Sequence, residues 1–240
     1  MAGRMTDAEI DLFAQWLRNP GVPDAEKNRQ CERMLADAQQ GLEVHGKAAC
    51  HLAYRIIDGG FAANRVWWVL DRLRGIELEA EICPTGWLGS RWKVSARMAE
   101  MYLRLLIVDH HAMGWALADV IRSSAVDVTV HPACAVNACR AAVLIATHAT
   151  VTGRDELAKC HIEECRKHFL GSIRSIHRWK PLMILAEEVG MMARMLRACE
   201  ILETAPADLT WRDQLKAVEP ARPFQDALIL ALQDDQSTHR

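Results

Sequence analysis

The chain has 240 residues, of which 50% are hydrophobic and 25% charged, so it can bury a core without disulfides or structural metals. Its formal net charge of −2 creates no overall field for nucleic acid or an anionic membrane, which excludes binding of either through bulk charge. No uninterrupted apolar run approaches the about 18 residues of a membrane span, and eight cysteines with mostly apolar neighbours predict reduced thiols and a cytoplasmic location.

The first half of the chain has the pattern of amphipathic helices joined by short breaks. Thr6 and Glu9 match a capping box, which predicts a helix that begins there and ends at residues 19–21. The buried stripe of this helix is predicted at Ile10, Phe13, Ala14 and Leu17. Further helices are expected at 24–58, at 61–82, and at 90–123 with a bend near 109–114. The first of these is expected to be weakest at Gly41 or Gly46, because glycine has a low helix propensity. Residues 84–90 are predicted to form a loop that displays Trp87.

The second half begins with a short alternating segment at 126–130, which predicts an extended connector. One extended segment cannot form a sheet alone, so no sheet is expected. Helices are then predicted at 132–151, 154–178 and 181–203, and the last of these is apolar over most of its circumference, as a central helix is. A final helix is predicted after Pro223.

These elements predict an all-α fold. We expect a compact multi-helix bundle or an irregular helical array of about seven to nine helices. The chain contains no low-complexity linker, so residues 1–240 are predicted to form a single domain. A sub-boundary near residue 128 would divide it into helical halves, 1–127 and 128–240.

No complete catalytic or cofactor motif occurs in the chain. The patterns of P-loop, dinucleotide-binding, zincin and hydrolase enzymes are absent, and so is any C-x-x-C pair. This absence favours a non-catalytic protein, although it does not decide whether the chain is an enzyme.

Tryptophan is unusually frequent, with eight residues against four phenylalanines and two tyrosines. Several lie next to arginine or lysine. Such pairs either anchor a half-buried indole beside a solvated cation or form a contact surface, because Trp and Arg dominate binding hot spots. The predicted partner-binding residues are Trp87, Arg91, Trp92, Arg174, Arg178, Trp179, Lys180 and Trp211.

A stripe of candidate metal ligands lies on the helix predicted at 154–178. His161, Glu164, Cys165 and His168 fall on one helical face, and all are ligand types for zinc or iron. A tetrahedral site would need a further ligand from another helix, and an ordinary ion pair beside a buried thiol explains the same residues. We therefore expect no cofactor, with zinc or iron as the alternative.

A basic stretch at 166–180 is the one local candidate for a phosphate-binding surface. Basic residues late in a helix also simply complement its dipole.

The sequence thus favours a non-catalytic helical module that binds a partner protein or complex stoichiometrically, as an adaptor, a regulator or an inhibitor of a larger assembly. The first alternative is an all-α metal-dependent or cysteine-dependent enzyme with its site around His161–His168. The second is a nucleic-acid-binding accessory protein that uses residues 166–180. No membrane partner is expected, and a homodimer is left open.

Overall fold

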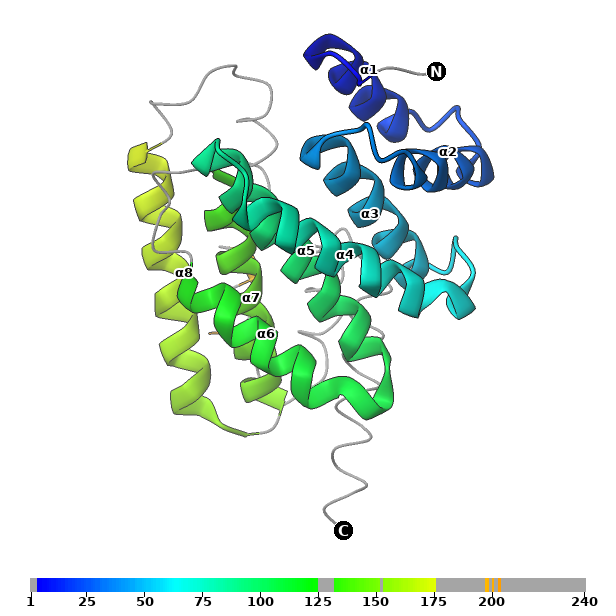
Figure 1. Cartoon of the computed structure of the whole chain (residues 1–240). Coiled ribbons are helices and arrows are strands. Elements are labelled where there is room, and N and C mark those ends of the chain that lie inside the picture. Colours follow the sequence, from blue (N-terminus) through cyan, green and yellow to red (C-terminus); the bar gives the residue numbers. More distant parts are fainter. Residues whose placement is uncertain are drawn as a thin grey trace. The chain divides into compact units, whose positions relative to one another are not determined.

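A computed structural model of the chain describes residues 4–124, 132–151 and 153–175, together with positions 197, 198, 200 and 203 (Figure 1). These residues form eight α-helices and two short 3-10 helices, and no strand occurs among them. The predicted all-α fold is confirmed. In this described part, no helix combines the length and the apolar character that crossing a membrane requires.

The chain divides into two compact units, Met1–Leu103 and Arg104–Arg240. The division falls inside one helix. The sub-boundary predicted near residue 128 lies among residues 125–131, outside the described residues.

The first unit is built around its third helix. Its elements are α1 (Asp7–Arg18), α2 (Asp24–Ala36), α3 (Leu42–Ile57), η1 (Ala63–Arg65), α4 (Val66–Glu81) and most of α5 (Gly86–Leu106). Helix α3 packs against α1, α2 and α4. Small and apolar side chains such as Ala48, Ala49 and Leu52 fill its buried side, which lets the neighbouring helices approach closely.

Helix α1 begins as the sequence predicts. The Thr6 hydroxyl accepts a hydrogen bond from the Glu9 amide, and the Glu9 carboxylate accepts one from the Thr6 amide, which completes the capping box. Phe13 is the buried residue of this helix, while Ile10, Ala14 and Leu17 are half-buried.

The helix predicted at 24–58 is in fact two helices. The Asp37 carboxylate accepts hydrogen bonds from the Gln39 amide at 3.0 Å and from the Gln40 side chain at 2.9 Å. These local bonds compete with helical ones and end α2. Gly41, one of the two positions where the helix was predicted to be weakest, is the N-cap of α3.

The loop predicted at 84–90 is shorter than expected, because α5 begins at Gly86. Trp87 therefore lies in the first turn of a helix, which corrects its assignment to a loop. Gly89 lets this turn approach α4, since a Cβ atom there would lie 2.5 Å from the carbonyl oxygen of Ala80. The helix predicted at 90–123 is also interrupted, by η2 (Val108–His110), close to the predicted bend.

The described part of the second unit is centred on α7. Its helices are α6 (His111–Ser124), α7 (Pro132–Val151) and α8 (Asp155–Ser175), and α7 packs against the other two (Figure 1). Ala138, Ala141 and Ala142 are fully buried on α7, so α6 and α8 can lie close to its backbone. Gly153, with φ of 70°, makes the turn before α8.

The helix predicted at 132–151 is confirmed, and the one predicted at 154–178 is described as far as Ser175. The segment predicted as extended at 126–130 and the predicted final helix lie outside the described residues. So does the helix predicted at 181–203, apart from four helical positions, Arg197, Ala198, Glu200 and Glu203.

Candidate protein-binding surfaces

Candidate metal ligands on α8 form hydrogen bonds and an ion pair with other residues of the same unit. His161 is buried, and its Nδ1 atom lies 3.3 Å from the Glu164 carboxylate. Arg122 of α6 donates to both oxygens of Glu164 from one nitrogen, at 2.6 and 2.7 Å. An arginine in this position competes with a metal ion for the same lone pairs.

Cys165 and His168 complete the predicted stripe. Cys165 is buried, and its carbonyl oxygen accepts a hydrogen bond from the Cys139 thiol at 3.5 Å. His168 lies on α8, but its side chain is outside what the structure describes. Among the described side chains, no group of three or more His, Cys, Asp or Glu residues could hold a metal ion. The zinc or iron site stays a prediction.

Two of the cysteines available to a cysteine-dependent enzyme have an unfavourable setting for a nucleophile. Burial raises the pKa of the Cys31 thiol to about 12. Burial likewise raises the pKa of Cys50 to about 12, although the nearby cations of Arg91 and Lys47 oppose the shift. A catalytic cysteine needs a lowered pKa, so these two thiols are expected to remain protonated near neutral pH.

The predicted contact residues at the start of α5 have different environments. Trp87 is 40% exposed. Arg91 lies 3.6 Å from the Glu43 carboxylate of α3, and its guanidinium is 4.9 Å from the centre of the Trp92 ring. Arg91 therefore joins α5 to α3 within the unit.

Trp92 is only 4% exposed. Its ring lies on Gly46 of α3, where a Cβ atom would be 2.3 Å from the indole. The Lys47 ammonium is 5.5 Å from the ring centre, so cations do accompany this indole, as its sequence neighbours predicted. Trp92 nevertheless packs in the core of its unit and not on the surface.

The side chains of the remaining predicted contact residues are outside the described part of the structure. Arg174 is on α8, and its side chain is not described. Arg178, Trp179, Lys180 and Trp211 lie outside the described residues. At the start of the basic stretch, Arg166 forms an ion pair with Glu203. Nucleic-acid binding by residues 166–180 stays a prediction.

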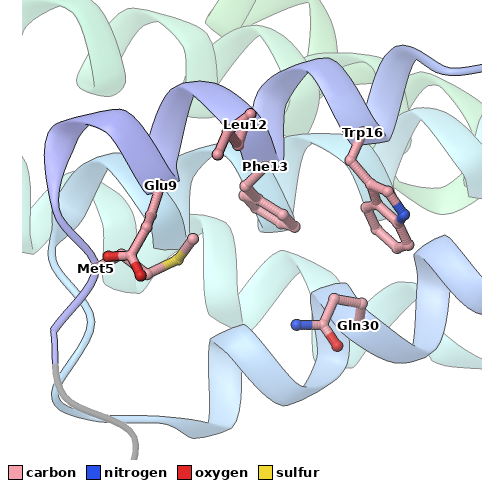
Figure 2. Close-up of a pocket in the computed structure, with 6 residues that line it drawn as sticks. All are labelled: Met5, Glu9, Leu12, Phe13, Trp16 and Gln30. Carbon is pink, nitrogen blue, oxygen red and sulfur yellow. The ribbon is translucent and has the colours of Figure 1, made fainter.

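An apolar groove of about 340 Å³, here called the α1 groove, runs along the first helix. Its lining residues are Met5, Glu9, Leu12, Phe13, Trp16 and Gln30 (Figure 2). Figure 2 shows Phe13 and Trp16 projecting from α1 towards α2, with Gln30 of α2 opposite them. The two rings are stacked, with centroids 6.2 Å apart. Leu12 is 63% exposed, although it is a large apolar residue.

This groove was not among the sites predicted from the sequence. Leu12 falls outside the predicted buried stripe of α1. A large apolar residue on the polar side of an amphipathic helix could have indicated a binding surface there. Gln30 lines the groove because α2 lies beside α1, and the hydrophobic pattern of either helix alone does not predict this placement.

One end of the α1 groove is acidic. The Thr6 amide and hydroxyl both donate to the Glu9 carboxylate at 2.8 Å, and they hold the pKa of Glu9 below its ordinary value. Asp7 and Asp11 are exposed on the same helix. Helical spacing, however, places Asp7 and Asp11 on the side of α1 away from the groove, so the groove combines an apolar floor with the single carboxylate of Glu9 at its N-terminal end.

A second surface with exposed apolar residues lies along α4. Trp67 is 54% exposed, Leu78 66% and Ile82, just after the helix, 83%. Charged residues lie between them on the same side, namely Asp71 and Arg74, and both are exposed. Large apolar side chains at this level of exposure commonly mark an interaction site when they form one patch.

A cleft of about 860 Å³ lies between α4 and the end of α2, and its lining is both polar and apolar. Asp71, Arg74, Gly75 and Leu78 of α4 form one side of it. His45 of α3 forms part of its wall. The Nδ1 atom of His45 lies 3.3 Å from the Glu79 carboxylate, and its Nε2 atom lies 3.1 Å from the carbonyl oxygen of Asp37. Both ring nitrogens are thus engaged within the unit, and they tie α3 to Glu79 of α4 and to Asp37 at the end of α2.

Comparison with known proteins gives no match that would assign a function to these surfaces. No family model matches the chain, and no curated protein or solved structure matches it either.

Proposed function

We propose that this chain is a non-catalytic module that binds a partner protein stoichiometrically through the α1 groove. The role would be that of an adaptor, a regulator or an inhibitor of a larger assembly. The observation that supports the proposal is the exposure of Leu12 at 63% beside the stacked pair of Phe13 and Trp16.

The size and lining of the groove suit a peptide segment. The groove has a volume of about 340 Å³ and is largely open to solvent, so a segment bound along it would keep one side exposed. An amphipathic helix or an extended segment would place one or two apolar anchors in it. The amide of Gln30 offers a donor and an acceptor for the main chain of such a segment.

Charge indicates which segments are favoured. The Glu9 carboxylate lines the groove at its N-terminal end. We expect a partner segment that combines apolar anchors with lysine or arginine at the end that meets Glu9, because complementary charge steers association and sets orientation.

Site-specific photo-crosslinking in the native cells tests the proposal. A photoreactive amino acid at Leu12 is expected to give one discrete adduct. The same amino acid at Gln15 is the matched control, since Gln15 is exposed on α1 but does not line the groove. The adduct at Leu12 should disappear when Trp16→Ala removes the neighbouring ring.

Once the adduct identifies the partner, affinity provides a second measurement. Leu12→Asp should weaken binding at least about tenfold, which corresponds to about 1.4 kcal/mol, while Gln15→Asp should leave it unchanged. Circular dichroism should show both variants folded. No discrete adduct at Leu12, or the same adducts at both positions, would overturn the proposal.

A further inference from the structure

Helix α4 carries an ordered stripe of four residues, here called the α4 stripe, which borders the cleft between α4 and the end of α2. Trp67, Asp71, Arg74 and Leu78 follow one another at intervals of four, three and four residues, which places them on one helical face. Apolar residues stand at the two ends and opposite charges stand in the middle. All four are exposed, and the Arg74 side chain is 60% exposed.

We propose that the α4 stripe pairs with the α4 stripe of a second copy of this chain. The two helices run antiparallel about a two-fold axis that passes between Asp71 and Arg74. In this register, Asp71 of each copy faces Arg74 of the other, and Trp67 of each faces Leu78 of the other. The stripe is thus complementary to itself, as a two-fold interface requires.

Charge selects the antiparallel orientation. In a parallel pair, Asp71 would face Asp71 and Arg74 would face Arg74, and both contacts would be repulsive. In the antiparallel pair, both charged contacts are attractive. Among the described residues, Arg74 forms one ion pair, at 3.7 Å with the Glu100 carboxylate, which is longer than a hydrogen bond. Its guanidinium can therefore turn towards a second copy without losing a strong hydrogen bond.

Gly75 is an independent observation in favour of this surface. It lies in the interior of α4, next to Arg74, and it is exposed. A Cβ atom at Gly75 would have no heavy atom of the structure within 4 Å. Glycine destabilises a helix interior relative to alanine, so packing within the described part of the chain does not explain it. The close approach of a second helix does explain it, because small residues let backbones come nearer.

The size of the interface sets the expected affinity. One helix pair buries less than the about 1,200 Å² typical of stable complexes, so a weak dimer is expected, with Kd on the order of 10–100 µM. This pairing does not depend on the α1 groove.

Sedimentation equilibrium with charge-reversed chains tests the pairing. The wild-type chain should dimerise at concentrations up to about 200 µM. Asp71→Arg and Arg74→Asp should each weaken its own dimer at least about tenfold, since each replaces two attractive contacts with two repulsive ones. The doubly changed chain should recover the wild-type affinity, and an equimolar mixture of the two singly changed chains should form a heterodimer.

Asp11→Arg, an equivalent charge change on α1, is the matched control and should dimerise like the wild type. Leu12→Asp should also leave the dimer intact, which separates this test from that of the α1 groove. A wild-type chain that stays monomeric to the highest concentration would overturn the proposal. So would singly changed chains that dimerise normally, or a doubly changed chain that stays monomeric while circular dichroism shows it folded.

Discussion

Gly46 shows how a single missing side chain can determine the packing of a helix pair. The Trp92 ring occupies the space that a Cβ atom of residue 46 would need, at 2.3 Å. An indole is rigid and large, so it cannot yield without moving α5 relative to α3 within the first unit.

We therefore expect Gly46→Ala to lower the free energy of unfolding by about 2 kcal/mol, although alanine is the better helix former. Gly75→Ala is the matched control, because its Cβ atom meets nothing within 4 Å. At concentrations where the chain is monomeric, Gly75→Ala should raise stability by about 0.5 to 1 kcal/mol. Urea unfolding measures both. Equal effects of the two substitutions would contradict the contact with Trp92.

His51 of α3 should make stability depend on pH. Burial lowers the pKa of His51 to about 4, and the positive charges of Arg55 and Lys27 add to the shift, while Asp24 opposes it. The unfolded chain, with an ordinary histidine pKa of about 6.5, therefore binds more protons than the folded chain at intermediate pH. Stability from this residue is fully present above about pH 6.5 and is lost as the pH falls towards 4.

The expected loss between about pH 7 and pH 5 is about 1 kcal/mol, a value reduced because the ring keeps some contact with water. Urea midpoints across this range measure the loss. His51→Gln, which does not titrate, should flatten the dependence. An unchanged slope in His51→Gln would show that another group causes it.

At the scale of elements, one ion pair joins α6 to α8. Arg122 contacts Glu164 at 2.6 Å and Asp119 of its own helix at 2.6 Å, and both Arg122 and Glu164 are partly shielded from water. Shielding and the fixed guanidinium geometry make this pair stronger than a fully exposed one.

We expect Arg122→Gln and Glu164→Gln each to destabilise the protein by about 1 to 2 kcal/mol, with a coupling energy of about 1 kcal/mol between them. A double-mutant cycle from urea unfolding gives the coupling. Arg197→Gln is a control, since its pair with Glu200 is highly exposed. A coupling near zero would mean that the pair forms without stabilising the packing of α6 on α8.

The elements that the sequence predicted well are those specified by neighbouring residues. The capping box of Thr6 and Glu9 and the helix that begins at Pro132 depend on residues within one or two turns. The split between α2 and α3 was predicted less well, because the side-chain bonds of Asp37 that end α2 are hardly visible in the hydrophobic pattern. The burial of Trp92, which was predicted to contact a partner, was not foreseen because it depends on Gly46, which is distant in sequence.

At the scale of the whole molecule, the division between the two units falls within a continuous helix. The division between Leu103 and Arg104 has no glycine, proline or polar run to mark it. The sub-boundary was instead predicted near residue 128, where a short alternating segment separates two helical stretches of the sequence. A division that depends on which helices pack together becomes visible only in three dimensions.

Gly75 also determines what a selection experiment on this protein would enrich. A screen for heat resistance in dilute solution rewards Gly75→Ala, because alanine favours the helix and meets no atom there. The added methyl group would stand in the gap across which a second copy approaches. Variants selected for thermal resistance would therefore lose the dimer. The residue at position 75 would show whether dimerisation or thermal stability had been favoured during the evolution of the chain.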